Sequence, residues 1–142
     1  MSITLEQART IIASARAAGQ AGGFKPLSVV VLDAGGHVTA FEREDGSSNM
    51  RFQIAHGKAH GAIALGMGSR ALMARAEQQP SFIAAATSAI GGALIPVPGG
   101  VLVQNEAGAV IGAVGISGDT SDNDEAAAVA GIEAAGLHAA TG

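Results

Sequence analysis

The chain has 142 residues and no cysteine, and its 12 acidic and 8 basic residues give a formal net charge of −4. This length suits one domain over residues 1–142, and the missing cysteines exclude disulfides and thiolate metal sites. The basic residues are scattered along the chain, which argues against nucleic-acid binding, because a nucleic-acid groove needs a continuous basic surface.

The first expected element is a helix with Thr4 as its N-cap and Gly22-Gly23 at its end. Apolar residues recur along it at helical spacing: Leu5, Ala8, Ile12 and Ala15. Charged residues interrupt the segment, so it lacks a signal-peptide core, and no apolar run approaches the ~20 residues of a membrane-spanning helix. We therefore expect a cytoplasmic protein that makes no contact with a membrane.

The next segment, PLSVVVLDAGGHVTAFERED, predicts two strands joined by a tight turn. Val29–Leu32 is continuously apolar, as in a strand that is buried on both faces, whereas Val38–Phe41 alternates between two faces. Asp33–Gly36 supplies the residues that a hairpin turn with positive φ needs.

Three helices are expected in the middle of the chain. The first lies in the stretch RFQIAHGKAHGAIALGMG, Arg51–Gly68, which contains His56 and His60 one helical turn apart. The second begins at Ser69 and is stopped by Pro80, and the third covers the following stretch SFIAAATSAI.

The last part of the chain returns to strands and then to a helix. Val101–Val103 and Val110–Ile116 are expected strands around a turn, and the final helix is expected to run from Ser121 to Ala140. Ser121 and Asp124 have the spacing of a capping box, with Asp where Glu or Gln is more usual. Hairpins in place of alternating strand–helix–strand units predict an antiparallel sheet with helices packed on it, which is the α+β class.

The histidine helix has one mixed apolar face. At 100° per residue, five residues fall within about 80° of one another: Phe52, Ile63, His56, Met67 and His60. His56 projects from within this apolar stripe and His60 from its edge, with their Cβ atoms ~6 Å apart. Lys58 points elsewhere, at about 240°.

Two histidines at positions i and i+4 are one way for a helix to offer two imidazoles to a metal ion. The zinc-protease motif fails because Gly57 stands where it needs a glutamate, and no local carboxylate supplies a third ligand. Haem needs only one or two axial ligands and an apolar slot, which suits His56 better. Two partly buried histidines bonded to nearby backbone are the third alternative, and the residues alone leave all three open.

Small residues favour close contacts of this helix and of the chain as a whole. Gly57 and Gly61 form a smooth patch where another helix or a second subunit could approach closely. Hydrophobic residues make up 48% of the chain, but only 3% are aromatic and 21 residues are glycine. Small side chains add little apolar area to a core, so we expect a homo-oligomer in which other copies complete the apolar surface.

Four acidic residues gather where the final helix begins: Asp119, Asp122, Asp124 and Glu125. Carboxylates at this place favour the positive end of the helix dipole. Asp124 or Glu125 is alternatively a general base or a hydrogen-bond acceptor at a pocket. A calcium loop is excluded because its sixth position lacks glycine, and the glycine-rich stretches lack the spacing of phosphate-binding motifs.

Three stretches carry a family pattern in a fixed order: PLSVVVLDAGGHVTAFEREDGS, then IAHGKA with ALGMGSRAL, then PGGVLVQNEAGAVIGAVGISGDTSDNDEAAAVAGI. Together they resemble the GlcG/HbpS-like family, which includes the C-terminal domain of PduO-type proteins. The resemblance runs from about Leu27 to Ile132. It implies a five-stranded antiparallel sheet in a profilin-like arrangement, and assembly into dimers or higher oligomers such as an octamer. Some members of the family bind haem, some degrade it, and others occur in catabolic settings without a settled activity.

The family motif can be carried over residue by residue. Lys58 and Ala59 match the motif of the histidine helix, whereas Gly61 replaces a threonine of the family. Without that hydroxyl group, His60 or His56 would have to serve in its place. The other matching positions are Asp33, Gly35, Gly36, Gly115, Gly118, Asp124 and Glu125.

The leading hypothesis is a binding pocket for haem as cofactor, or for a comparable flat or small organic ligand. The resemblance and the helical face together give the lining residues: Phe52, His56, His60 and Met67. Arg51 and Lys58 would lie near propionates or carboxylates, and Asp33 is a further ligand-binding candidate. His56 is the favoured axial ligand because it lies deeper in the apolar stripe.

The second hypothesis is a cofactor-free isomerase, lyase or hydrolase that acts on small carboxylates in a catabolic operon. Its roles fall to six residues: His56 or His60 as acid and base, Arg51 or Arg43 to hold the carboxylate, and Asp124 or Glu125 to orient the imidazole. A third hypothesis is a non-catalytic accessory protein that stabilises a partner enzyme.

Overall fold

Hairpin connections build one antiparallel sheet. The structure, a computed structural model, describes residues 1–142, with these helices and strands: α1 (Leu5–Ala21), β1 (Ser28–Asp33), β2 (Val38–Arg43), α2 (Arg51–Leu65), α3 (Ser69–Gln78), α4 (Pro80–Ala89), β3 (Gly100–Gln104), β4 (Val110–Ser117), α5 (Ser121–Ala134) and β5 (His138–Ala140). The strand order is β2-β1-β4-β3-β5, and every neighbouring pair is antiparallel. The prediction of an α+β fold with a five-stranded antiparallel sheet is confirmed.

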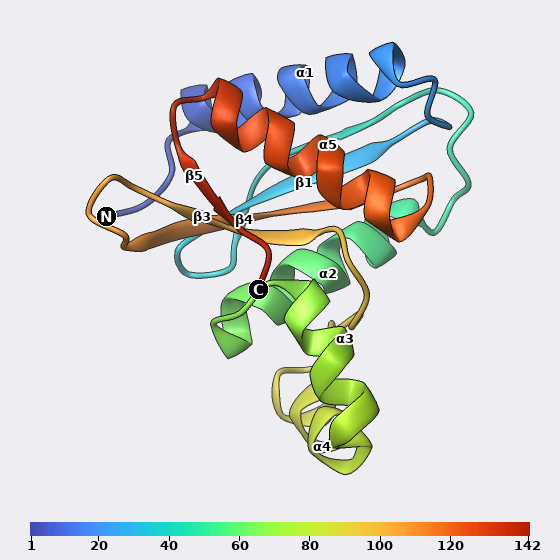
Figure 1. Ribbon diagram of the computed structural model, residues 1–142, viewed down its shortest axis with the longest axis vertical. Helices are drawn as coiled ribbons and strands as arrows, with labels where there is room; N and C mark the ends of the chain where they lie inside the picture. Colours follow the sequence, from blue (N-terminus) through green and yellow to red (C-terminus); the bar gives the residue numbers. More distant parts are fainter.

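Side chains that alternate along the strands divide the core into two layers. On β1, Val29 and Val31 pack toward α1 and α5, whereas Val30 and Leu32 pack toward α2. Figure 1 shows α1 and α5 side by side over one face of the sheet and α2 across the other face. The continuous apolar run in β1 is therefore explained, because this central strand is buried on both faces.

The β1–β2 turn and the start of α1 follow local sequence signals. Asp33 Oδ1 accepts hydrogen bonds from the backbone N–H groups of Gly35 and His37, both at 2.9 Å, and Gly36 has φ +83°. Thr4 caps α1 by accepting from the Gln7 N–H at 3.1 Å, and the Gln7 side chain accepts from the Thr4 N–H. None of the helices is both long enough and apolar enough to cross a bilayer.

Small residues let the backbone of α2 approach the sheet closely. Ala55, Ala59 and Ala62 are fully buried beneath the sheet. A Cβ on Gly115 of β4 would collide with the Ala55 carbonyl oxygen, and one on Gly100 of β3 would collide with the Lys58 carbonyl. Much of the glycine and alanine content therefore serves contacts within the chain.

The glycine patch of α2 is covered by the chain itself. Ile95 lies against Gly57, Leu94 lies against Gly61, and the Ile95 N–H donates to the Gly57 carbonyl at 3.0 Å. We expected either another helix or a second subunit to cover this patch. The structure shows that neither does, because the segment after α4 lies against it. This segment becomes a wall of the candidate site.

Helices α3 and α4 form a hairpin beyond the two layers, at the bottom of Figure 1. Leu72 of α3 and Ile83 and Ala86 of α4 form a small core together with Leu94 of the following segment. Pro80 does more than stop the preceding helix, because it is the first residue of α4, where its missing N–H costs no helical hydrogen bond.

The prediction for the final helix is wrong about where the helix ends and about its N-terminal cap. The helix α5 ends at Ala134, Gly136 follows with φ +75°, and the chain then forms β5, which pairs with β3. Thr120 is the N-cap, since its hydroxyl group accepts from the Asn123 N–H at 3.2 Å. The capping box expected at Ser121 is therefore not formed.

Candidate functional site

One side of α2 carries a row of parallel rings. The Phe52 and His56 ring centroids lie 5.5 Å apart with an interplanar angle of 19°, and those of His56 and His60 lie 5.4 Å apart at 22°. Their spacing of four residues places one ring above the next along the helix. Phe41 of β2 extends the row, meeting Phe52 edge-on at 4.8 Å. The structure thus brings the two histidines and Phe52 together, as the helical face predicted.

A cavity of about 440 Å³ adjoins this row, which is within the range of small-molecule pockets. It is lined by Phe52, Gln53, His56, Gly57, Gly91, Gly92, Ala93, Leu94 and Ile95. One wall is α2, and the other is the segment Gly91–Ile95 that leaves α4. None of the lining residues carries a permanent charge, so the cavity suits an uncharged or flat apolar group.

The His56 ring faces this cavity, in surroundings that favour its neutral form. Burial, and then the neighbouring His60, lower the pKa of His56 below its ordinary value of 6.5. The hydrogen bonds of histidine rings in the structure involve His37 and His60 and leave the His56 ring without a partner. A neutral imidazole with a free nitrogen can coordinate a metal, accept a proton or bond to a ligand.

His60 is held against the opposite wall. Its Nδ1 lies 3.1 Å from the Ala93 carbonyl oxygen. Since a carbonyl oxygen only accepts, this bond requires a proton on Nδ1. The bond joins α2 to the Gly91–Ile95 segment, so His60 positions the wall of the cavity.

Several predicted ligand-binding residues lie away from the cavity. Met67 packs against the small core of the α3–α4 hairpin. The Arg51 side chain donates to Ser48 and Ser117, and Arg43 donates to the Ser47 carbonyl. The expected cavity contacts of Met67, Arg51 and Arg43 are therefore not formed.

Two further candidates, the carboxylates of Asp33 and Glu125, also bond to groups away from the cavity. Asp33 bonds within the β1–β2 turn, where its pKa is lowered chiefly by the His37 N–H. Glu125 accepts from Arg70 Nε at 3.0 Å. Asp33 therefore does not line the cavity, and the expectation that it binds a ligand there is wrong. Glu125 is not placed to orient an imidazole of α2, so this part of the enzyme hypothesis is also wrong.

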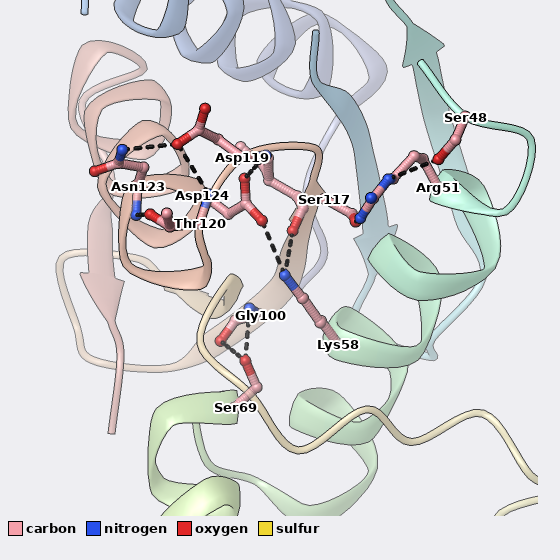
Figure 2. Close-up of polar contacts among 11 residues, drawn as sticks. Ser48, Arg51, Lys58, Ser69, Gly100, Ser117, Asp119, Thr120, Asn123 and Asp124 are labelled. Carbon is pink, nitrogen blue, oxygen red and sulfur yellow. Dashed lines mark hydrogen bonds and ion pairs between the residues drawn. The ribbon is translucent and has the colours of Figure 1, made fainter. Parts of the chain in front are cut away.

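Lys58 and Asp124 form a buried ion pair on the other side of α2 (Figure 2). Lys58 Nζ donates to Asp124 Oδ2 at 3.1 Å and to the Ile116 carbonyl at 2.9 Å, and each charged side chain is only 2% exposed. Asp124 Oδ1 accepts from the Asp119 N–H at 2.9 Å. Burial lowers the pKa of Lys58 and raises that of Asp124, and their mutual attraction opposes both shifts. The prediction that Lys58 faces a ligand and that Asp124 orients a histidine is therefore wrong.

The sequence contained a signal for this pair. Lys58 stands between Gly57 and Ala59, and no other charged residue lies between Arg51 and Arg70. A lysine among such small residues sits where the helix packs closely, and a buried lysine needs a carboxylate partner. That reasoning would have directed attention to the acidic cluster after β4.

The structure places no group of three or more histidine, cysteine, aspartate or glutamate side chains where they could hold a metal ion. His56 and His60 remain two imidazoles without a third protein ligand.

A comparison with known protein families finds one match that covers most of the chain. The model of the family described as haem degrading protein HbpS-like matches residues 3–133. No curated protein sequence matches the chain significantly.

Solved structures share the fold over nearly the whole chain. A double mutant of Streptomyces reticuli HbpS is 28% identical, with a TM-score of 0.80, and the match covers 94% of this chain and 86% of that one. Klebsiella pneumoniae protein ORFY is 25% identical, with a TM-score of 0.84 and coverage of 94% and 90%. A structure described as a PduOC:haem complex is 23% identical, with a TM-score of 0.84 and coverage of 96% and 97%.

Proposed function

This chain belongs to the HbpS-like family of haem-degrading proteins, and on that premise we propose that it binds haem in the cavity between α2 and the segment Gly91–Ile95. The observation that carries the proposal is the His56 imidazole, which lines the cavity and has no hydrogen-bond partner within the chain. The PduOC structure, which shares this fold, is a complex with haem and so supports this choice of ligand.

The residues of the cavity fit haem in two respects and leave one of its groups without a partner. A haem iron accepts a neutral imidazole as axial ligand, and a flat macrocycle needs apolar walls. His56 would hold the group through a ring nitrogen, and Phe52, Leu94 and Ile95 would supply apolar contact. The propionates would find no cation among the lining residues, because Arg51 and Lys58 are bonded elsewhere.

Bound haem would supply an iron centre for oxygen or peroxide chemistry, which is what haem degradation requires. In this chain, His56 would bind and orient the group, and His60 would keep the Gly91–Ile95 wall in place through Ala93. Degradation itself would be measured as the time-dependent loss of the Soret band after ascorbate is added in air.

Titration with haemin tests the binding proposal. We expect a shifted Soret band that saturates near one haemin per chain, and at least a tenfold loss of affinity in His56→Ala. His138→Ala is the matched control, because His138 is exposed on β5. An unshifted band in the wild type, or equal affinity in His56→Ala and the wild type, would refute the proposal.

We also propose that the chain forms a homo-oligomer. Large apolar side chains remain exposed on several elements: Leu5, Val38, Met50, Phe82 and Val110. Light scattering after size-exclusion chromatography should give a multiple of the 13.9-kDa chain mass, and a mass of one chain would contradict the proposal. An accessory role toward a partner enzyme stays a prediction.

A further inference from the structure

A second and smaller cleft, of about 190 Å³, lies at the first turn of α2. It is lined by Lys25, Pro26, Gly46, Ser47, Ser48, Arg51 and Gly118. Three connections meet there: the one before β1, the β2–α2 loop and the end of β4. No lining residue is hydrophobic, and none is shared with the cavity beside His56. The cleft therefore suits a polar ligand, and this ligand would bind at a site separate from the proposed haem cavity.

Arg51 gives this cleft a positive charge without a counter-ion. Its Nε donates to Ser48 Oγ at 2.9 Å and its Nη1 to Ser117 Oγ at 3.0 Å, as Figure 2 shows. These two hydroxyl groups fix the guanidinium, which has five N–H donors in all. The ion pairs of the structure involve Arg16, His37, Lys58 and Arg70 as cations, so no carboxylate neutralises Arg51.

Other groups around the cleft add to the positive potential or lack a partner. Lys25 is an exposed second cation in the lining. The Ser47 hydroxyl oxygen is buried and has no hydrogen-bond partner, although such a group nearly always finds one. The first turn of α2 has no side-chain cap and no acidic residue, so the positive end of its dipole is uncompensated.

The carboxylate of Asp119, next to the lining residue Gly118, is already engaged by donors of its own loop. Asp119 Oδ1 accepts from the Lys25 N–H at 2.8 Å, and Oδ2 accepts from the Thr120 N–H and the Asn123 side chain. These bonds hold Asp119 at the start of α5, where it serves the structure of the loop. It therefore leaves the Arg51 guanidinium without a carboxylate contact.

We propose that this cleft binds a small oxoanion, the carboxylate or phosphate group of a small molecule, with Arg51 as its principal partner and Lys25 as a second cation. An arginine fork matches both groups, and its remaining N–H donors form charge-assisted hydrogen bonds. A volume of about 190 Å³ is below that of pockets for drug-sized ligands, which restricts the occupant to a compact anion. The proposal does not depend on haem binding.

Calorimetric titration at constant ionic strength tests the site, with inorganic phosphate and succinate as separate probes and chloride as the reference salt. We expect saturable binding of at least one probe at one anion per chain. Arg51→Gln should weaken it at least tenfold, and Lys25→Gln a few-fold. Arg9→Gln is the matched control, because Arg9 is an exposed arginine of α1 that makes the same change of charge.

The two probes also identify the source of the anion. Tighter phosphate binding indicates a phosphorylated ligand, and tighter succinate binding indicates a carboxylate. Binding of neither probe, or equal affinity in Arg51→Gln and Arg9→Gln, would overturn the proposal. Circular dichroism checks the fold of each variant, and if Arg51→Gln is unfolded, unchanged affinity in both Arg51→Lys and Lys25→Gln would overturn it instead.

Discussion

The two sides of α2 place polar groups in opposite circumstances. On the closed side, Lys58 is buried, and its ammonium group bonds to Asp124 and to the Ile116 carbonyl. On the open side, His56 lines a cavity and has no hydrogen-bond partner within the chain. A polar group whose bonds are all made inside the protein supports the fold, whereas one left free beside a cavity is available to a ligand.

This difference separates two kinds of perturbed titratable group. Burial shifts the pKa of Lys58 and of His56 in the same direction. Perturbed pKa values are common at functional sites but also occur in structural ion pairs. In α2, the bonding partners and the adjoining space distinguish the two cases, and the pKa shift alone does not.

The largest expected loss of unfolding free energy comes from removing one partner of the Lys58–Asp124 pair on the closed side. Lys58→Met leaves Asp124 buried without its partner, which costs about 3–5 kcal/mol of unfolding free energy in comparable pairs. Urea denaturation at neutral pH measures this loss. Lys25→Met is the control, because Lys25 is exposed, and it should change stability by less than about 0.5 kcal/mol.

The double variant Lys58→Met/Asp124→Leu sharpens the comparison. Removing both charges should recover much of the stability lost in Lys58→Met, because no unpaired charge then remains buried. If Lys58→Met alone is as stable as the wild type, the pair is not the structural element that we describe.

A smaller effect is expected from the open side. Phe52→Ala removes the ring that stacks on His56 and meets Phe41 edge-on. Since Phe52 is only partly buried, we expect a loss of about 1–2 kcal/mol, below the range for a phenylalanine in a core. Denaturation should show this loss together with weaker haemin binding, and unaltered haemin binding would contradict the assignment of Phe52 to the cavity.

Acid titration should weaken the loop that holds Asp119, which adjoins the closed side through the bond of its N–H to Asp124. The N–H of Lys25, then the Asn123 side chain and the Thr120 N–H, lower the pKa of Asp119 from 3.8 to about 2. A carboxylate with a depressed pKa stabilises the fold above pH 4, and this stabilisation is lost as pH falls from about 4 to about 2. Asp119→Asn should therefore lose less stability over this window in urea titrations. An identical loss in the variant and the wild type would contradict this account.

The smallest effect should come from protonation of His56. Because its pKa is lower in the folded chain than the ordinary 6.5, the unfolded chain binds a proton more readily, and stability falls as pH drops below 6.5. His56→Gln removes this contribution, so the difference between the wild type and the variant should shrink from pH 7.5 to pH 5. A constant difference would place His56 in a more solvated setting than the structure gives.

Elements with local signals could be predicted from the sequence. Thr4 and the apolar spacing identified α1, and Asp33–Gly36 identified the β1–β2 turn. The strand β5 could not be predicted, because the alanine-rich stretch around it favours a helix and only pairing with β3 makes it a strand. Gly136, with its positive φ, was the local sign that α5 ends before it.

The candidate site was predictable as a helical face and not as a cavity. Helical spacing placed Phe52, His56 and His60 together, and it also placed Lys58 on another side. The opposite wall could not be derived, because the segment Gly91–Ile95 reaches α2 only through tertiary packing. The same limit applies to Asp124, whose partner lies 66 residues away in the sequence.

The α3–α4 hairpin stands outside the two layers with a small core of its own, and the wall Gly91–Ile95 leaves directly from it. Segments with few buried apolar contacts open at a lower free energy than a central sheet, so amide exchange should be faster in α4 than in β1. Each opening of the hairpin would widen the cavity beside His56. The residence time of a ligand there would then depend on how often this hairpin opens locally, without any opening of the sheet.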